Sequence, residues 1–361
     1  MIHRYLLSVL LCSSALAEVR LETLPEDGMQ PQIAVSASGM AHLIYLKGNP
    51  KGCEVRYTSR AVDAPTWAPP MTVNSVPKSA IAMGTIRGAQ LSLGKMDSVQ
   101  VIWNGSAAGA EDPASAPLWY ARLEQGAGAF SPQVNLMEGV ALDGGASIAA
   151  NGNGSVCVVW HAAPKVAEGE RARIVWVKRS ADDGYTFAKA RPLNAASPGV
   201  CACCSLRASL GDDGVLHVLY RGAPEMDERG MRWISQRDGK TTVKVLDQWK
   251  LAACPMSSCA IHGTAMAWEN DGRICVSLGN SASVVSLATA GAKHPVIAKS
   301  RSGLTLVASV VGSGWAKSGT LLWDLLDASG RIVDSGTGPK LPVWSFPAAY
   351  ARTDGGFVVL R

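Results

Sequence analysis

Residues 206–220 read Leu-Arg-Ala-Ser-Leu-Gly-Asp-Asp-Gly-Val-Leu-His-Val-Leu-Tyr, and this stretch decides the fold. A short apolar segment leads into a turn of Gly and Asp, and an alternating segment that ends in an aromatic residue follows. Alternation with a period of two is typical of a β-strand with one buried face, and Gly and Asp favour a tight turn. The stretch therefore predicts a β-hairpin.

The same pattern recurs along the chain. Clear copies cover residues 33–45, 89–103, 146–160 and 264–278, and weaker copies cover residues 295–310 and 347–360. The first four copies start about 55 to 60 residues apart, which leaves room for a four-stranded blade with long loops. We therefore expect an all-β fold, a β-propeller of six or seven four-stranded blades. The segment 19–24 is expected to close the last blade.

Third strands are legible after four of the hairpins, at residues 54–59, 118–123, 173–180 and 231–236. The third of these runs into Ser-Ala-Asp-Asp-Gly-Tyr-Thr-Phe at residues 180–187. In such a turn Asp182 can accept hydrogen bonds from main-chain amides, Gly184 can take a positive φ, and Phe187 can plug the blade. The motif resembles the Asp-box of sialidase-like propellers. That resemblance implies a sialidase-like fold and a carbohydrate or glycoconjugate partner.

The first 17 residues have the pattern of a secretory signal peptide. His3 and Arg4 precede an apolar run from Tyr5 to Leu11, and the small residues Ala15 and Ala17 follow. We expect cleavage after Ala17, which leaves residues 18–361 as a single propeller domain in the periplasm or outside the cell. No other apolar run is long enough for a membrane span, so none is expected after cleavage.

The charge pattern bears on the partner. The formal net charge is +5, and the 34 basic residues are scattered along the chain rather than clustered. A nucleic-acid-binding protein usually presents a basic patch or stripe. We therefore expect no nucleic-acid partner.

Five of the cysteines form two clusters, Cys201-Ala-Cys203-Cys204 and Cys254-Pro-Met-Ser-Ser-Cys259. Each cluster directly precedes an inner strand of adjacent blades, so we expect the two to face each other at the channel mouth. Structural disulfides are one interpretation, since disulfides persist outside the cytoplasm. Soft-metal binding, with copper or zinc as the candidates, is the second. A redox or sensing pair at Cys203 and Cys204 is the third.

The metal interpretation uses a defined ligand set. Its members are thiols of the two clusters together with a thioether and an imidazole nearby: Cys201, Cys203, Cys204, Cys254, Met256, Cys259 and His262. The segment also resembles a subgroup of bacterial sialidase-like proteins that carry a Cys-rich stretch, a Tyr-Arg strand end and a later Trp before Cys-Pro-Met. The matching residues outside the clusters are Tyr220, Arg221, Trp249 and Pro255.

The resemblance to sialidases implies a requirement for arginines that hold the substrate carboxylate, with carboxylates for acid-base chemistry. The segment that normally carries the first arginine reads Gly-Met-Gln-Pro-Gln-Ile at residues 28–33 and has none. Other arginines near predicted strand ends are the candidates instead, with two carboxylates from a nearby loop. The candidate catalytic set is Arg87, Arg207, Arg221, Asp227 and Glu228.

Two functions follow from these observations. The first is glycan recognition or glycoside hydrolysis, with the site at the channel mouth near blades four and five. If the chain is an enzyme, the resemblance implies a sialidase-like glycoside hydrolase. The second is a non-enzymatic role as a metal-binding or disulfide-stapled interaction protein. Clustered arginines with a carboxylate favour the first, whereas stoichiometric copper or zinc favours the metal form of the second.

Overall fold

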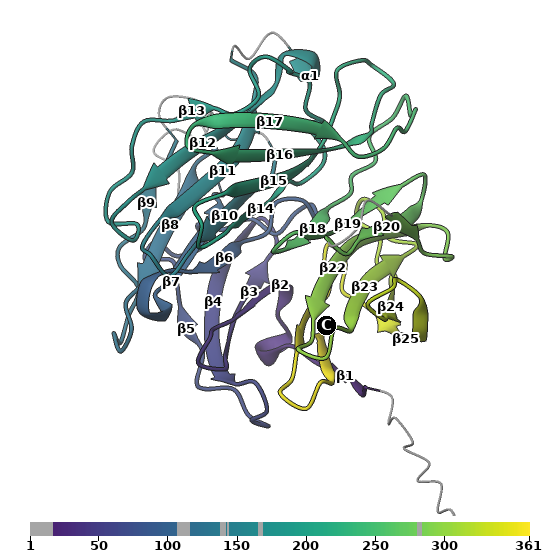
Figure 1. Ribbon diagram of the computed structural model, residues 1–361. Coiled ribbons are helices and arrows are strands. Elements are labelled where there is room, and N and C mark those ends of the chain that lie inside the picture. Colours follow the sequence, from purple (N-terminus) through teal and green to yellow (C-terminus); the bar gives the residue numbers. More distant parts are fainter. Residues whose placement is uncertain (1–16, 107–115, 138–141, 143, 165–168, 280–283) are drawn as a thin grey trace, which may run out of the picture.

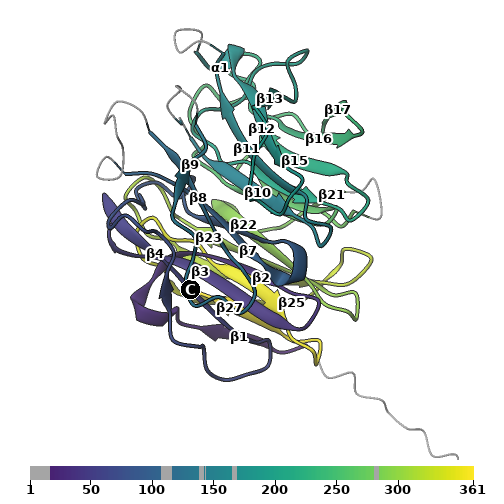
Figure 2. The same ribbon diagram turned by 90° about the vertical axis from the view of Figure 1, so that its left-hand side faces the viewer.

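The computed structural model describes residues 17–106, 116–137, 142, 144–164, 169–279 and 284–361. In this part of the chain seven small β-sheets lie around a common axis, with the first strand of each sheet near the centre (Figure 1). Figure 2, turned by 90°, shows the same sheets from the side. The expected all-β propeller is confirmed, and the number of blades is seven. The predicted signal peptide lies almost entirely outside the described residues.

Six blades contain four antiparallel strands each. In chain order the strands of blades one to three are β2 (Met29–Val35), β3 (Met40–Asn49), β4 (Gly52–Ala61), β5 (Met71–Thr72), β6 (Gln90–Leu93), β7 (Val99–Asn104), β8 (Leu118–Leu123), β9 (Val134–Asn135), β10 (Ala146–Ala150), β11 (Val156–Ala162), β12 (Ile174–Ser180) and β13 (Arg191–Pro192). Those of blades four to six are β14 (Arg207–Leu210), β15 (Leu216–Arg221), β16 (Met231–Arg237), β17 (Lys240–Val245), β18 (Cys259–His262), β19 (Ala265–Asn270), β20 (Arg273–Ser277), β21 (Val284–Ser286), β22 (Ala292–Lys299), β23 (Thr305–Val311), β24 (Thr320–Leu326) and β25 (Ile332–Lys340).

The seventh blade joins the two ends of the chain. It consists of β26 (Ala348–Ala351), β27 (Phe357–Leu360) and β1 (Val19–Glu22), and β1 pairs parallel to β27 with Val19 opposite Phe357. This confirms the expected closure, although the blade has three strands rather than four. Because the closing strand comes from the other end of the chain, the ring cannot open without breaking this pairing.

Helical structure is short. The described residues hold one helical turn, α1 (Gly169–Ala172), and two 3₁₀ turns, η1 (Pro25–Asp27) and η2 (Lys95–Asp97). Within the described residues, no helix is long and apolar enough to span a bilayer.

The core lies between neighbouring blades. The alternating strands turn one row of apolar side chains toward the next blade; in one cluster Ile44 and Val55 of blade one pack with Val101 and Trp103 of blade two. The aromatic residues that end the repeated pattern are buried: Trp103 is 1% exposed and Tyr220 is fully buried. Removing such large apolar surfaces from water is the main stabilising term of the fold.

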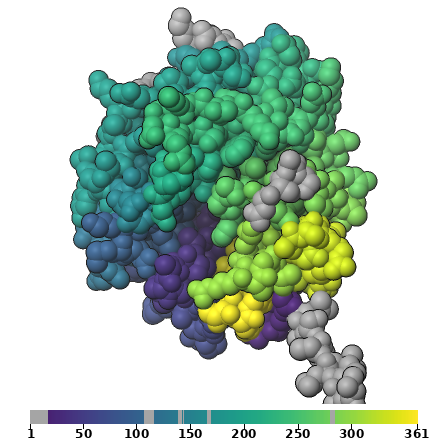
Figure 3. All heavy atoms as spheres, viewed as in Figure 1, coloured from purple at the N-terminus to yellow at the C-terminus, as the bar shows by residue number. Residues whose placement is uncertain are grey.

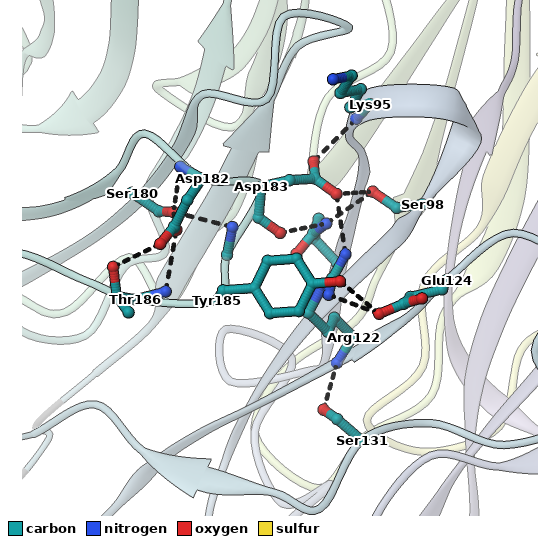
Figure 4. A network of polar contacts seen from close by, with 12 residues as sticks. Lys95, Ser98, Arg122, Glu124, Ser131, Ser180, Asp182, Asp183, Tyr185 and Thr186 are labelled. Carbon is teal, nitrogen blue, oxygen red and sulfur yellow. Dashed lines mark hydrogen bonds and ion pairs between the residues drawn. The ribbon is translucent and has the colours of Figure 1, made fainter.

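The turn after β12 links blade three to blade two (Figure 4). As expected, Asp182 accepts hydrogen bonds from the main-chain N–H of Thr186 at 2.9 Å and from the hydroxyls of Ser180 and Thr186. The next residue, Asp183, points the other way and accepts from Ser98 Oγ and from Arg122 across the blade boundary. The turn therefore both folds on itself and ties two blades together.

Gly184 in this turn has a φ of +85°, and a Cβ there would clash with the hydroxyl oxygen of Tyr120. We expect Gly184→Ala to lower the free energy of unfolding by about 1 to 3 kcal/mol more than the matched substitution Gly126→Ala. Gly126 has a φ of +78°, but a Cβ added there would meet no atom within 4 Å, so this control isolates the steric effect. Urea denaturation of both variants measures the difference, and equal losses would contradict the packing account.

Candidate functional site

The first strands of the seven blades surround a central channel. Each of them contacts the first strand of the next blade, and β26 contacts β2 to complete the ring. A cavity of about 410 Å³ runs along one side of this channel. Its wall consists of β2, β18, β22 and β26, with Arg207 from β14. Figure 3 shows the surface hollowed where these blades, drawn purple, green and yellow, meet.

The cavity opens where the first strands end, not where they begin. Its exposed lining residues lie at or beside the hairpin turns, and they include Val35, His262, Arg301 and Thr353. Its inner end reaches Ser258 and Phe346, which are buried. The cavity therefore opens on the face of the propeller opposite to the cysteine clusters, which precede their inner strands.

The charged side chains that line the cavity are basic. Its ionisable nitrogen-bearing side chains are Arg207, His262, Lys299, Arg301 and Arg352, and none of the described residues that line it is Asp or Glu. Arg352 is paired with carboxylates outside the lining, including Glu18 at 3.2 Å. A concave site with several cations and no carboxylate in its wall attracts anions.

Desolvation by the surrounding protein atoms shapes the acid-base behaviour of two of these groups, Arg207 and His262. The pKa of Arg207 is lowered from its usual value because the guanidinium is desolvated in the channel. The pKa of His262 is lowered by desolvation and by the nearby charge of Lys299. His262 therefore contributes a neutral imidazole at pH 7, whereas Lys299 and Arg301 contribute positive charge near the opening.

The opposite end of the channel is crossed by a loop. This crossing loop, residues 82–88, lies between β5 of blade one and β6 of blade two, and it contacts blade six across the ring. The side-chain amide of Gln30 donates to the carbonyl of Ala82 at 2.6 Å and to that of Trp344 at 2.7 Å. Thr85 Oγ1 lies 3.2 Å from Nε2 of His294 in blade six.

His294 continues the contact to blade five, since its Nδ1 lies 3.1 Å from the hydroxyl of Ser258. The imidazole is 2% exposed, and burial, with Lys293 and Arg207 nearby, lowers its pKa to about 3. A neutral imidazole can donate from one nitrogen and accept at the other, which suits its two hydroxyl neighbours. The crossing loop is thus held by a neutral histidine, which no sequence motif pointed to.

The five predicted catalytic residues are dispersed. Arg207 lines the cavity, and Arg87 lies in the crossing loop, half-buried. Asp227 and Glu228 lie in the loop after β15, where Glu228 pairs with Arg232 at 3.1 Å. Asp227 lies 3.9 Å from Lys250 at the surface. Of the five predicted catalytic residues, Arg207 alone is among the described residues that line the cavity.

Arg221 is placed inside the protein. It is 2% exposed, and its guanidinium donates to the carbonyl oxygens of Arg229 at 2.7 Å and Glu269 at 2.6 Å. The same guanidinium lies 4.9 Å from the ring centroid of Trp249. These contacts join blade four to blade five, so Arg221 positions the loops that surround the cysteines.

The first cysteine cluster converges on one point. The sulfur atoms of Cys201, Cys203 and Cys204 all lie within 4.8 Å of one another, and those of Cys201 and Cys203 are 3.4 Å apart. The main-chain N–H groups of Met256 and Ser257 face Cys203 and Cys204 respectively and act to lower the pKa of these thiols. The two cysteine segments therefore face each other as expected, but the second segment approaches the three sulfurs with its backbone rather than with its own cysteines.

The three thiols differ in acidity. Hydrogen bonding to Cys203 is the main effect that raises the pKa of Cys201. The pKa of Cys203 is raised too: Cys201 lowers it, but Cys204 and burial outweigh that effect. Burial raises the pKa of Cys204, yet bonds from Cys201 and Cys203, the charge of Arg221 and the Ser257 N–H together bring it below its usual value. The cluster thus favours one thiolate, on Cys204.

The rest of the predicted ligand set lies elsewhere. Cys254 is exposed, and Cys259 is buried with its sulfur 3.6 Å from the carbonyl of Leu219. His262 belongs to the cavity on the opposite face. Met256 contributes a backbone N–H to the cluster. The expected ligand set of seven residues was thus too wide, because β18 carries its two ends to different faces of the propeller.

All eight cysteines in the described part of the chain are free. The sulfurs of Cys201 and Cys203, at 3.4 Å, are much farther apart than the two sulfurs of a disulfide bond, at about 2.05 Å. The expected disulfides between the clusters are therefore not present in this structure.

No protein-family model matches this sequence, and no curated protein matches it significantly. The fold is similar to that of an α-L-arabinofuranosidase from Fusarium graminearum, solved with an iminosugar inhibitor, at a TM-score of 0.56 and 9% identity over 87% of this chain and 98% of that one. An α-L-arabinanase from Penicillium chrysogenum, complexed with arabinobiose, matches over the same shares of the two chains at a TM-score of 0.53 and 10% identity.

A Trypanosoma rangeli sialidase in complex with the inhibitor DANA matches at a TM-score of 0.50 and 10% identity. The match covers 84% of this chain and 54% of the sialidase, so this chain spans about half of that protein's length. At such identities these likenesses establish the sialidase-like β-propeller fold and nothing finer.

Proposed function

We propose that this chain binds an acidic glycan in the central cavity. The observation that carries the proposal is the lining of the cavity. Arg207, Lys299 and Arg301 supply positive charge there, and none of the described residues that line it is acidic. Guanidinium and ammonium groups are well suited to the carboxylates or sulfates of acidic sugars. Ile33 and Val35 add apolar surface in the same wall, against which a sugar ring can pack.

Recognition is a better match to this cavity than hydrolysis. Most glycoside hydrolases place two carboxyl groups on either side of the scissile bond. The described lining offers neither, and Asp227 and Glu228 belong to a surface loop rather than to the cavity. The sequence predicted a site at the channel mouth near blades four and five. The proposed site instead lies at the other end of the channel, where Arg207 of blade four lines the cavity together with residues of blades five, six, seven and one.

The structural neighbours are consistent with this proposal, because the three named above are enzymes in complex with a sugar or an inhibitor. A glycan partner also suits a chain exported to the periplasm or beyond, as the signal-peptide pattern of residues 1–17 predicts.

The test is calorimetric titration of the protein with uronic-acid and sialic-acid oligosaccharides and with their methyl esters. The ester keeps the sugar rings and removes the charge, so we expect the acid form to bind at least about 10-fold more tightly. The double variant Lys299→Gln, Arg301→Gln is expected to weaken binding of the acid form by about 10-fold or more. Added salt should weaken it further, since exposed charges are screened.

The matched control is Lys250→Gln, which removes an exposed cation far from the cavity lining. Its binding should equal that of the unaltered protein. Equal affinity for acids and esters, or a loss in the control as large as in the cavity variant, would refute the proposal.

A further inference from the structure

The backbone of the cysteine cluster is held by hydrogen bonds at Cys201, Ala202 and Ser205. The N–H of Cys201 donates to the carbonyl of Arg221 at 3.0 Å, and the N–H of Ala202 donates to Oε1 of Glu170 at 2.7 Å. The N–H of Ser205 donates to the carbonyl of Ser257 at 3.2 Å. The three sulfurs are therefore brought together by contacts that do not involve the sulfurs themselves.

The second segment completes the surroundings of the sulfurs. Met256 adopts a φ of +48°, a backbone conformation that non-glycine residues rarely take, and its N–H and that of Ser257 face the sulfurs of Cys203 and Cys204. Successive N–H groups around such a residue form a concave site that favours negative charge. The guanidinium of Arg221, fixed by two carbonyl oxygens, adds a positive charge near Cys204.

Accessibility differs among the three thiols. Cys201 and Cys204 are buried, whereas Cys203 is partly exposed. A small ion can thus reach the cluster past Cys203, and the two deeper sulfurs are shielded from bulk solvent.

We propose that Cys201, Cys203 and Cys204 together bind one Cu(I) ion through their three sulfurs. Thiolates select soft ions, and Cu(I) accepts three thiolate ligands in a plane. Structural zinc sites require a fourth ligand. Of the other predicted thiol and imidazole ligands, Cys254 is exposed, His262 lies on the other face, and Cys259 does not belong to the group of described residues whose ligand atoms converge. As each Cu–S bond forms, a sulfur that still carries a proton releases it to solvent, and the N–H donors and Arg221 offset the remaining negative charge.

This site is separate from the glycan cavity, so either proposal can fail alone. The experiment is an anaerobic titration of the reduced full chain with Cu(I) in competition with a chromogenic Cu(I) chelator. We expect one Cu(I) per chain, sulfur-only coordination in X-ray absorption, and no displacement by equimolar Zn(II).

The decisive variant is Cys203→Ser, because this thiol is partly exposed and its loss leaves no buried cavity. The Cu(I) affinity of this variant should fall at least about 100-fold. Removing a residue that only hydrogen-bonds to a metal ligand already lowers metal affinity by about 10- to 100-fold, and Cys203 is a ligand itself in this proposal. The matched control Cys254→Ser removes an exposed thiol of the neighbouring segment and should bind as the unaltered chain does. Circular dichroism and thermal unfolding report whether each variant folds.

Three results would overturn the proposal. The first is Cu(I) binding by Cys203→Ser at unchanged affinity. The second is preference for Zn(II) over Cu(I) in the direct competition. The third is failure of the folded, fully reduced chain to bind one Cu(I), with thiol alkylation of Cys203 unaffected by the metal.

Discussion

Acidification from pH 7 to pH 4 is expected to cost the unaltered protein about 3 kcal/mol of folding free energy through His294 alone. The pKa of this buried imidazole is lowered to about 3, whereas an unfolded chain keeps a histidine pKa of about 6.5. Between pH 6.5 and pH 3 the imidazole of His294 is therefore protonated in the unfolded state but stays neutral in the folded state. The contribution is fully present above pH 6.5 and is lost as the pH falls toward 3.

The measurement is urea denaturation of the unaltered chain and of His294→Gln at pH 7 and pH 4. Gln cannot take up a proton, so the drop in stability between the two pH values should be smaller in the variant by about 3 kcal/mol. His217→Gln is the control for the loop contact. Desolvation lowers the pKa of that imidazole too, but the ring packs near Trp233 on blade four, so this variant should leave the crossing loop unchanged. Hydrogen exchange in residues 82–88 should rise at low pH in the unaltered chain, since Thr85 contacts His294. Identical pH dependence in the chain and the His294 variant would rule the account out.

Replacing Arg221 with Met is expected to lower the free energy of unfolding by about 3 to 5 kcal/mol. The substitution keeps an apolar stem beside Trp249 but removes the two donors, so the carbonyl oxygens of Arg229 and Glu269 lose a charged partner inside the protein. Hydrogen bonds to charged groups are the stronger ones, and an unsatisfied buried acceptor carries its full desolvation cost. Chemical denaturation measures the loss.

Arg207→Met is the matched control, because Arg207 faces the cavity and donates to the carbonyl of its own neighbour, Leu206. Its effect on stability should stay below about 1 kcal/mol, and its effect should appear in glycan binding instead. A stable Arg221→Met variant would mean that this arginine serves a ligand rather than the junction of blades four and five.

Much of the fold was predictable, because each blade repeats the same local pattern. The hairpin at residues 146–160 appears as β10 paired with β11, with Ala146 opposite Trp160. The weak copy at residues 295–310 is a true blade, and its alternation fails because the pairing of β22 with β23 shifts register between Lys293 and Val296. His294 lies in that irregularity, where it turns inward to hold the crossing loop.

The site was predicted only in part. The convergence of Cys201, Cys203 and Cys204 follows from their closeness in sequence, and the structure brings their sulfurs together. Arg207 was singled out because it begins an inner strand, and it does line the cavity. Lys299 and Arg301 were not singled out, since they lie at the end of β22 and in the turn that follows it, and only the closing of the ring brings this turn beside those of the other blades at one opening.

The sequence by itself therefore determined the strands, their turns, the closing of the ring by residues 19–22 and the grouping of three thiols. These depend on local alternation, on Gly and Asp in turns and on short separations along the chain. Only the tertiary structure decided which end of the channel is open, that Arg221 is buried, and that His262 and the cysteines lie on opposite faces. Those features depend on contacts between residues far apart in the chain, such as Thr85 with His294, and no local pattern encodes such a contact.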